Sequence, residues 1–466
     1  MFDFSAYLNH IACITPAGDT LTYARLEELS CSLGDLLQSD SLTFILCKNT
    51  PAALVGYVAA LQKHSVGLLL NAEIDAALLR NLIDLYQPQQ LWLPKDTVQN
   101  WISLGYQETF SYAEYVLIKC DVPSQALPRE LAVLLTTSGS TGSPKLVRLS
   151  QENLLSNARS IQQYLQISDS ERPITSLPMY YSYGLSVINS HLISGATLLL
   201  TEDSYVERSF WEFARLQNAT SFAGVPYTYE ILKKLKVVKY DLPFLKTFTQ
   251  AGGKLSEPLI KYFTENLLSQ GKRFFVMYGQ TEATARMSYM PLDSALQKIG
   301  SVGIAIPNGC FRIENEGHSI DEPNQVGELV YQGRNVSLGY ATSKEDLYRG
   351  DDNHGTLHTG DLAYLDADGF VYIVGRTKRF IKLYGNRVSL DYTENLIRTQ
   401  FNIEVACVGT DEKMIVYTTD RESGNDLLKY LAATTHLQHS AFEIRYVDSI
   451  PHSETGKILY NSLSNT

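Results

Sequence analysis

Short apolar runs alternate with segments of helical periodicity over residues 1–130. The apolar runs predict buried strands at Thr43–Leu46, Val66–Leu70 and Leu91–Leu93. Apolar residues at helical spacing predict one helix over Leu26–Leu33 and a second, buried helix over Ala52–Leu61. Strands that alternate with helices in this way favour a parallel sheet covered by helices.

The hydrophobic pattern over residues 131–165 predicts a strand, a loop, a second strand and a helix. The first strand is expected at Leu131–Thr136, which combines apolar and β-branched residues, and a second short strand at Leu146–Leu149. Ser150 suits the N-cap of the following helix, in which the apolar positions from Leu154 to Leu165 fall on one face.

The loop between these two strands combines small hydroxylated residues with glycines and ends at Pro144 and Lys145. Its candidate binding residues are Thr137, Ser138, Gly139, Ser140, Thr141 and Gly142. Such a loop can bring backbone N–H groups close to an anion, and the lysine adds a positive charge, so phosphate is the expected ligand. The alternative is a Ser/Thr/Gly surface loop, which the composition alone would equally allow. The spacing is not that of a Walker A loop, because a proline precedes the lysine and a strand follows it.

Length and charge narrow the class of protein. A chain of 466 residues with 44% hydrophobic residues can bury a large core and is expected to form at least two domains. The net charge of −11 argues against a nucleic-acid surface or a polybasic membrane anchor. The six cysteines form no CxxC pair, which is typical of reduced thiols in a cytoplasmic protein. The first residues, MFDFSAYLNH, lack a basic and then an apolar region, so no secretory signal is expected, and no apolar run approaches the length expected of a membrane span.

A second candidate site lies in Phe274–Glu282, FFVMYGQTE. A strand is expected to end at Tyr278, and Gly279 would allow a tight turn before Thr281 and Glu282. A hydroxyl can donate a hydrogen bond to a phosphate, a carboxylate can bind Mg2+, and an aromatic ring can stack on adenine.

Five strings, taken in order, resemble the motifs of the adenylate-forming (AMP-binding) superfamily, which includes acyl-CoA synthetases, peptide-synthetase adenylation domains and luciferases. They are LAVLLTTSGSTGSPKLVRLS, FFVMYGQTE, HTGDLAY, VYIVGRTKRFIKLYGNRVS and IPHSETGKILY. The resemblance implies an α/β fold with a large N-terminal domain of parallel-rich sheets covered by helices, plus a smaller β subdomain. A small mobile α+β C-terminal domain would follow. The implied boundaries are 1–375 for the domain with the ATP and acyl pockets and 376–466 for the lid, with a hinge near Gly375–Lys378.

The resemblance also implies a role for each matched residue. ATP would contact the Thr137–Gly142 loop together with Tyr278, Gly279, Asp361 and Arg376. It would also contact Gly252 and Gly253 of the string AGGKLS, which follows the same order along the chain. Within this set Tyr278 would stack on adenine, Asp361 would bind the ribose hydroxyls, and Arg376 would reach the ribose or a phosphate. The catalytic residues would be Lys145 on the β- and γ-phosphates, Thr281 and Lys457 on the α-phosphate, and Glu282 on Mg2+. Lys378 would be the hinge pivot, and Gly385 would line the pantetheine tunnel.

The segment Leu177–Ile188, LPMYYSYGLSVI, resembles the part of the family that walls the acyl pocket, although a proline-broken aromatic cluster of this kind is, taken alone, more often core than a ligand pocket. The candidate pocket residues are Tyr181, Ser182 and Tyr183. Tyr181 stands where acyl- and aryl-CoA ligases usually have a histidine, and Ser182 stands where amino-acid-activating relatives have an aspartate. Without that carboxylate a buried ammonium would be costly, which disfavours a free α-amino acid and favours a neutral acyl or aryl tail.

The expected function is ATP-dependent activation of a small carboxylic acid as an acyl-adenylate, with release of pyrophosphate and transfer of the acyl group to a thiol. The thiol would belong to CoA or to the phosphopantetheine of an acyl or peptidyl carrier protein. The alternatives are an amino-acid adenylation enzyme that feeds a carrier protein and a non-catalytic nucleotide-binding descendant. A phosphotransferase that releases ADP and a luciferase-like oxygenase are further alternatives.

Overall fold

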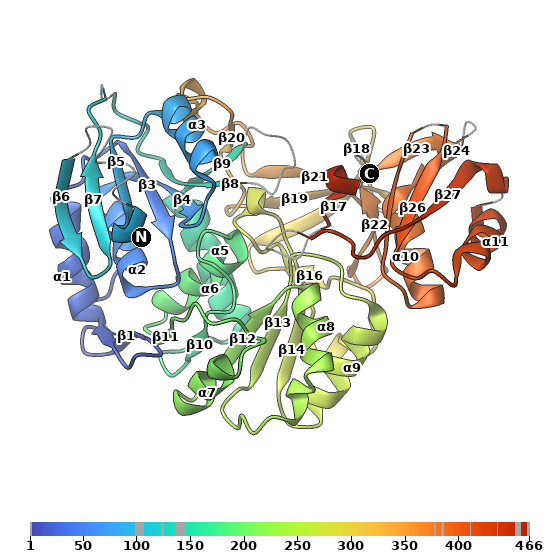
Figure 1. Cartoon of the computed structure of the whole chain (residues 1–466), viewed down its shortest axis with the longest axis horizontal. Helices are drawn as coiled ribbons and strands as arrows, with labels where there is room; N and C mark the ends of the chain where they lie inside the picture. The colour runs from blue at the N-terminus through green and yellow to red at the C-terminus, as the bar shows by residue number, and fades with distance from the viewer. Residues whose placement is uncertain are drawn as a thin grey trace.

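The structure is a computed structural model, which describes residues 2–97, 107–122, 125–136, 145–376, 379–383, 386–410, 412–435, 437–452 and 458–463. Figure 1 shows two large sheets with helices on and between them, an antiparallel sheet beside them, and a separate group of C-terminal strands and helices. This is an α/β fold, as the sequence predicts. No helix in the described part of the chain is long and apolar enough to cross a bilayer.

The first sheet has the strand order β20-β9-β8-β4-β3-β5-β7-β6. Its strands are β3 (Leu42–Cys47), β4 (Val66–Asn71), β5 (Gln90–Pro94), β6 (Gln107–Tyr112), β7 (Tyr115–Lys119), β8 (Leu131–Thr136), β9 (Leu146–Ser150) and β20 (Gly339–Ala341). The central strands β8, β4, β3 and β5 pair in parallel, whereas the strands at both edges are antiparallel. The predicted strands are confirmed, and the sheet is parallel only at its centre.

The second sheet has the order β16-β15-β14-β13-β12-β10-β11-β1-β2. Its neighbouring strands β14, β13, β12, β10, β11 and β1 pair in parallel. Its strands are β1 (Ile11–Ile14), β2 (Thr20–Thr22), β10 (Pro173–Ile174), β11 (Leu198–Leu199), β12 (Ser221–Gly224), β13 (Thr247–Gln250), β14 (Arg273–Tyr278), β15 (Ser288–Tyr289) and β16 (Ile304–Ala305). Because parallel strands end at the same edge, the segments that follow β12, β13 and β14 are brought together there.

Helices cover and separate these two sheets. They are α1 (Tyr23–Gly34), α2 (Pro51–Lys63), α3 (Ala76–Tyr86), α5 (Gln151–Leu165), α6 (Ser182–Leu192), α7 (Arg208–Leu216), α8 (Pro226–Lys234) and α9 (Glu257–Leu268). Short 3-10 turns accompany them: η1 (Lys95–Thr97), η2 (Val237–Lys239), η3 (Thr281–Ala283), η4 (Leu292–Ser294) and η5 (Glu345–Tyr348). Ser150 caps α5 as predicted, since its side chain accepts a hydrogen bond from the Asn153 N–H and the Asn153 side chain accepts one from the Ser150 N–H.

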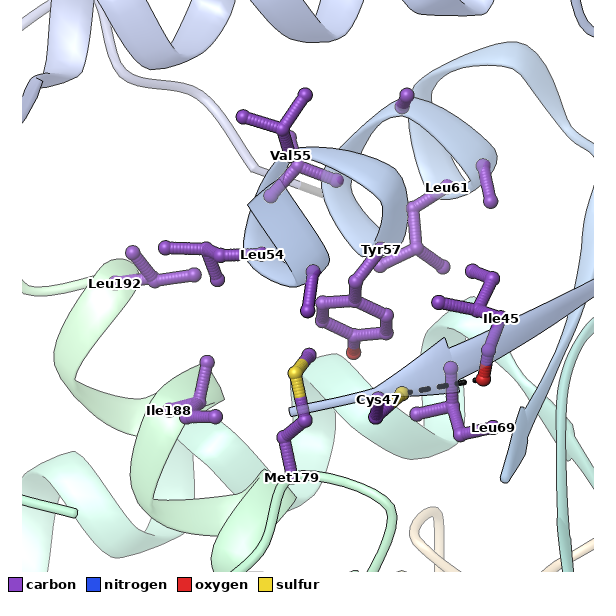
Figure 2. Close-up of a cluster of buried hydrophobic side chains, with 14 of the residues drawn as sticks. Ile45, Cys47, Leu54, Val55, Tyr57, Leu61, Leu69, Met179, Ile188 and Leu192 are labelled. Carbon is purple, nitrogen blue, oxygen red and sulfur yellow. Dashed lines mark hydrogen bonds between the residues drawn. The ribbon is translucent and has the colours of Figure 1, made fainter. Parts of the chain in front are cut away.

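The core between the sheets is built around α2, which is buried on all sides from Ala52 to Leu61. Figure 2 shows Tyr57 of α2 among side chains from β3, β4 and α6, including Cys47, Leu69 and Ile188. The Tyr57 hydroxyl donates to Asn189 Oδ1 at 2.9 Å, which satisfies the one polar group that this tyrosine buries. This packing fixes α6, and therefore the residues at its N-terminus, relative to the first sheet.

An antiparallel sheet of order β18-β17-β19-β21-β22 follows. Its strands are β17 (Gly309–Asn315), β18 (His318–Ile320), β19 (Gly327–Gly333), β21 (Thr356–Leu365) and β22 (Val371–Arg376). The C-terminal elements are β23 (Phe380–Leu383), β24 (Asn386–Ser389), α10 (Leu390–Phe401), β25 (Val405–Gly409), β26 (Met414–Thr418), α11 (Gly424–Thr435), η6 (His439–Ala441), β27 (Phe442–Tyr446) and α12 (Tyr460–Leu463). They share a hydrophobic cluster of their own, which includes Ile397, Val416 and Leu427. The division at Gly375–Lys378 stays a prediction.

Candidate active site

The phosphate-binding loop expected from the sequence lies outside the described residues, since Thr137, Ser138, Gly139, Ser140, Thr141 and Gly142 all fall in the undescribed stretch 137–144. Its two anchors are described. They are the ends of β8 and β9, which pair antiparallel with Thr136 opposite Leu146. The first residue after the loop, Lys145, therefore stands at the end of the first sheet next to β20.

Lys145 lies beside a tyrosine that the sequence analysis did not single out. Its Nζ lies 3.1 Å from the ring centroid of Tyr340, a geometry that allows a cation–π interaction. Tyr340 reaches this position because β20 pairs antiparallel with β9, which places Tyr340 opposite Val147. Tyr340 is the last residue of the string GELVYQGRNVSLGY, and only its place at the end of that string could have drawn attention to it.

The same tyrosine contacts the expected Mg2+ ligand. The Tyr340 hydroxyl donates to Glu282 Oε1 at 2.8 Å. Burial, and then the negative charge of Glu282, raise the pKa of Tyr340, so the phenol stays protonated as a donor. A main-chain bond of 2.8 Å from Ser337 N–H to the Glu282 carbonyl holds the two segments together. Lys145, Tyr340 and Glu282 thus converge from three distant parts of the chain.

Glu282 is a single carboxylate, and no cluster of three or more possible metal ligands occurs among the described residues. A single carboxylate nevertheless fits Mg2+ in a nucleotide site. This ion keeps several waters and is commonly held by one or two carboxylates together with the phosphates of the substrate. If Mg2+ binds here, Glu282 would hold it, and the ion would neutralise phosphate charge.

The expected α-phosphate ligand, Thr281, opens the 3-10 turn η3 directly after the strand β14 and its Gly279 turn. Its hydroxyl lies 3.1 Å from the hydroxyl of Ser182, the first residue of α6. A predicted pocket residue and a predicted catalytic residue are therefore neighbours. The N-terminus of α6 lies at the same place, where its partial positive charge would favour an anion.

The turn that carries Thr281 requires glycine at position 279. A Cβ atom built on Gly279 would lie 1.7 Å from the carbonyl oxygen of Ala285, which is far inside any tolerated contact. Gly252 is similarly constrained, with a φ of +86° and only 2.6 Å between a built Cβ and the Tyr181 hydroxyl. The Tyr181 side chain thus lies directly against the Gly252 turn, while Gly253 packs against Pro226.

A hydrogen-bonded network joins the other predicted nucleotide ligands. The Tyr278 hydroxyl donates to Asp361 Oδ2 at 2.5 Å, and Gln280 Nε2 donates to the same oxygen at 2.8 Å. Arg376 Nε donates to Asp361 Oδ1 at 2.9 Å, because β21 and β22 place the two residues opposite each other. Burial, and then the charge of Asp361, raise the pKa of Tyr278. Gln280 was not among the predicted site residues.

Both oxygens of Asp361 already accept hydrogen bonds from side chains, although its predicted role was to accept from the two ribose hydroxyls. A carboxylate has about four acceptor sites, and these three bonds leave one of them, on Oδ1, so the contacts leave room for one ribose hydroxyl unless a side chain gives up its bond. A bound ribose would therefore share the Asp361 carboxylate with Tyr278, Gln280 and Arg376, which hold it in place.

The predicted pocket residues Tyr181, Ser182 and Tyr183 lie together at the start of α6. Tyr183 is 3% exposed, and its hydroxyl donates to Thr249 Oγ1 at 2.9 Å. Burial raises the pKa of Tyr181 to about 12, so this phenol stays neutral at physiological pH. Through its bond to Thr249, Tyr183 lies beside a cavity whose lining includes Val187, Ala223 and Thr249.

The hinge and lid residues of the prediction, Lys378, Gly385 and Lys457, lie outside the described residues. The chain shortly before Lys457 is described at His452, whose ring stacks on Tyr227 of α8 with 5.9 Å between centroids. His452 also pairs with Ile458 in an isolated bridge. The roles of Lys378 and Lys457 stay predictions.

Known proteins resemble this chain over most of its length. A family described as AMP-binding enzyme matches residues 4–341. Among curated proteins, oxalate–CoA ligase of Arabidopsis thaliana is 32% identical over 267 residues, which cover 56% of this chain and 51% of the relative. Sulfoacetate–CoA ligase of Cupriavidus necator is 27% identical, covering 72% and 67% respectively. The 2-succinylbenzoate–CoA ligase of Bacillus anthracis is 30% identical, covering 61% and 58%. The aligned chain thus spans only about half of the first of these relatives.

Solved structures share the fold almost end to end. O-succinylbenzoate coenzyme A synthetase (MenE) from Bacillus subtilis, in complex with ATP and magnesium ion, superposes with a TM-score of 0.80 at 21% identity. That match covers 98% of this chain and 96% of the other. ATP-bound MatB from Rhodopseudomonas palustris gives a TM-score of 0.77 at 22% identity, with 98% and 95% covered. At this identity the likeness establishes the fold.

Proposed function

The chain belongs to the AMP-binding enzyme family, and on this premise we propose that it is an AMP-forming acid–thiol ligase. It would activate a small carboxylic acid with ATP as an acyl-adenylate, release pyrophosphate, and pass the acyl group to the thiol of CoA. The names of the curated relatives, all CoA ligases, support CoA as the acceptor over a carrier protein. The cytoplasmic location expected from the sequence belongs to the same proposal.

The first half-reaction brings two anions together. A carboxylate oxygen attacks the α-phosphorus of ATP, the bond from that phosphorus to the bridging oxygen breaks, and pyrophosphate leaves with the electron pair. Little covalent chemistry falls to the protein, so catalysis depends on positioning and on neutralising charge. A site for this reaction therefore needs cations, hydroxyl donors and a place for Mg2+ within one small region.

One observation carries the proposal, which is the convergence of Lys145, Tyr340 and Glu282 beside the Thr281–Ser182 pair. In this arrangement Lys145 would bind the β- and γ-phosphates, and Thr281 would donate to the α-phosphate. Tyr340 would hold the Glu282 carboxylate in the orientation that Mg2+ needs. Removing one contact to developing charge in such a site costs about 10²–10³ in rate.

The adenosine would lie across the Tyr278–Asp361–Arg376 network, with Gly252 and Gly253 allowing the backbone to approach the flat base. The network is buried at Asp361, which is 3% exposed, and opens to solvent at Arg376. A carboxylate held from both sides loses little freedom when it accepts a ribose hydroxyl, which favours binding.

The second half-reaction requires the thiol to reach the adenylate. By analogy with the family, Lys457 would serve the first step, and a rotation about Lys378 would then bring the Gly385 loop toward the pantetheine. Lys457→Ala should abolish acid-dependent exchange of pyrophosphate into ATP, while thioester formation from supplied acyl-adenylate continues. Equal loss in both assays would rule out this alternation.

The test of the function itself is ATP–pyrophosphate exchange across a panel of organic acids, followed by product analysis with CoA and with holo-carrier proteins. The proposal requires acid-dependent exchange, AMP rather than ADP as the product, and an acyl-CoA thioester. Release of ADP would indicate a phosphotransferase instead. ATP binding without exchange for any acid would indicate a non-catalytic descendant, and exchange with amino acids only would indicate an adenylation enzyme of the peptide-synthetase type.

A further inference from the structure

Arg286 is a buried cation that the proposed adenylation step does not use. It lies between β14 and β15, and only 1% of its surface is exposed. Arginine is almost never fully buried without a partner, because a buried charge is costly unless it is paired and hydrogen-bonded.

The contacts that Arg286 makes with other described residues are neutral. Nη1 donates to the Tyr164 hydroxyl at 3.0 Å and lies 2.7 Å from Met277 Sδ. The guanidinium lies 4.5 Å from the ring centroid of Tyr183. Nε is buried and has no hydrogen-bond partner, and no carboxylate within the described ranges forms an ion pair with Arg286. The site therefore holds a positive charge and an open donor without an anion.

Arg148 shows how the same chain satisfies a buried arginine elsewhere. Its side chain is 0% exposed, and its Nη2 forms an ion pair with Asp352 Oδ2 at 2.6 Å. It also donates to the carbonyl oxygens of Leu338, Tyr340 and Arg349. The contrast indicates that the neutral surroundings of Arg286 are suited to an anion that comes from outside the chain.

Arg286 lines the cavity beside the predicted acyl pocket, together with Val187 and His191 of α6 and Thr249 of β13. Burial, and to a lesser extent the charge of Arg286, lower the pKa of His191 to about 4, so this imidazole is neutral at physiological pH. His191 therefore adds no second positive charge that would compete with Arg286 for an anion.

Two other charged residues line the same cavity, and both are already bonded within the protein. Arg273 donates to Thr247 Oγ1 and to the Leu165 carbonyl, and Glu171 accepts from the Thr220 hydroxyl. Of these three charged residues in the described lining, Arg286 is the one with a buried N–H that has no hydrogen-bond partner, and it is therefore the one suited to receive an anionic ligand.

The backbone of Arg286 lies against the turn that carries Thr281. A Cβ atom built on Gly279, in the turn before Thr281, would lie 2.9 Å from the Cα of Arg286. The residues just before it, Thr284 and Ala285, have φ of +56° and +95°, which is a strained backbone for side chains other than glycine. Side-chain amides of Asn157 and Asn335 donate to the Arg286 carbonyl and hold this strained turn in place. Such strain is commonly kept where a residue must be aimed at a ligand.

We infer that Arg286 binds a second anionic group, a carboxylate or a sulfonate, on the tail of the acid whose carboxyl group is activated. The substrate would thus be a diacid, with one anion at the α-phosphate beside Thr281 and the other at the guanidinium. This inference deepens the proposed function and rests on it. It differs from the neutral acyl or aryl tail expected from the sequence, because a buried guanidinium favours an anionic group.

The experiment compares acids in matched pairs that differ only in the terminal group: malonate with propionate, succinate with butyrate, glutarate with valerate, and phthalate with 2-methylbenzoate. Sulfonate analogues of the best diacid form a further arm. ATP–pyrophosphate exchange is measured with the full-length protein. At one chain length or more, we expect kcat/KM for the diacid to exceed that of its neutral partner by about 10- to 100-fold. A preference for the neutral acid in every pair would overturn the inference and leave the proposed function standing. Absence of exchange with all acids would instead overturn the proposed function.

Three variants assign the preference to this residue. Arg286→Met should raise KM for the diacid and reverse the preference within the best pair, whereas Arg286→Lys should keep part of it. Arg273→Met removes the other arginine of the cavity and should leave the preference unchanged. If Arg286→Met lowered activity equally with both acids of a pair, or if Arg273→Met reversed the preference, the inference would be wrong. Should Arg286→Met fail to fold, the Arg286→Lys ratio and the wild-type panel still decide.

Discussion

Tyr340 makes two contacts in the proposed phosphate site, and substitutions can separate their effects. Its hydroxyl holds the Glu282 carboxylate at 2.8 Å, and its ring faces Lys145 Nζ at 3.1 Å. Tyr340→Phe removes the first contact and keeps the ring, whereas Tyr340→Leu removes both. The two variants should therefore fail in different ways.

The magnitude follows from the chemistry of the bond. A hydrogen bond to a charged group contributes about 1.5–3 kcal/mol, which corresponds to about 10- to 100-fold in a binding constant. Loss of a group that orients a metal ligand also costs about 10- to 100-fold in metal affinity. For Tyr340→Phe we expect the Mg2+ concentration at half-maximal exchange to rise by about tenfold, since water can partly replace the lost donor. At saturating Mg2+ the rate should be close to that of the wild type.

Tyr340→Leu should show the same shift and an additional one. A cation–π contact contributes about 0.5–2 kcal/mol, so removing the ring should also raise KM for ATP by about 2- to 30-fold through Lys145. Because burial and Glu282 raise the pKa of Tyr340, its hydroxyl stays protonated up to at least the ordinary tyrosine value of about 10. The ratio between wild type and Tyr340→Phe should therefore not change with pH below that value.

The matched control is Tyr86→Phe. The Tyr86 hydroxyl donates to the carbonyl of Ala341, the residue next to Tyr340, at 3.2 Å, so this variant loses a tyrosine hydroxyl against the same strand without touching Glu282. The assay is pyrophosphate exchange titrated with Mg2+ and with ATP. An unchanged Mg2+ requirement in Tyr340→Phe, or an equal shift in Tyr86→Phe, would refute the reasoning.

Three further predictions concern the turn, a buried histidine and a buried ion pair. Gly279→Ala should displace the Thr281 turn and lower kcat/KM by about 10²-fold with the fold retained, which circular dichroism and exchange assays together would check. His191 has its pKa lowered to about 4, so the unfolded chain binds the extra proton between about pH 4 and its ordinary value of about 6.5. The free energy of unfolding should therefore be unaffected by this histidine above that window and should fall by about 1.4 kcal/mol per pH unit as the pH is lowered through it. In His191→Gln, the free energy of unfolding measured with urea should depend less steeply on pH over the same range. Asp352→Ala leaves the buried Arg148 without its carboxylate and should lower the free energy of unfolding by about 1.5–3 kcal/mol, whereas Asp35→Ala, in an exposed pair, should change it by less than about 1 kcal/mol.

The helices, strands and caps could be predicted well from the sequence, because they depend on residues close together along the chain. The Ser150 cap, the buried α2 and the strand that ends at Tyr278 all have the residues and spacing that the structure uses. The mixed character of the first sheet could not be predicted in the same way. Whether a short apolar strand pairs parallel or antiparallel depends on its neighbours in space, and β20, which supplies Tyr340, joins β9 from almost 200 residues away.

The site shows the same division between local and distant information. Thr281 and Glu282 belong to a short string with recognisable chemistry, so sequence alone identified them as candidates. The contacts of Tyr340 and the burial of Arg286 could not be predicted, because both depend on residues that are distant in the sequence, and an isolated arginine is ordinarily on the surface. The positive φ of Ala285, which turns Arg286 inward, was equally hidden, since no glycine marks that turn.

The hydrogen bonds around Asp361 connect the proposed nucleotide site to the strand that precedes the C-terminal elements. Tyr278 ends β14, just before the turn that carries Thr281, and Arg376 ends β22, the last strand before the proposed hinge, yet both bond the same buried carboxylate. The guanidinium of Arg376 has five N–H donors, of which the Nε–H bonds Asp361. A ribose or phosphate oxygen that bound this guanidinium would either use its other donors or replace the bond to Asp361. Any such change alters the end of β22, from which the chain passes directly to Lys378. A carboxylate that is shared between the bound nucleotide and the start of the hinge would therefore couple the two without any longer path through the core.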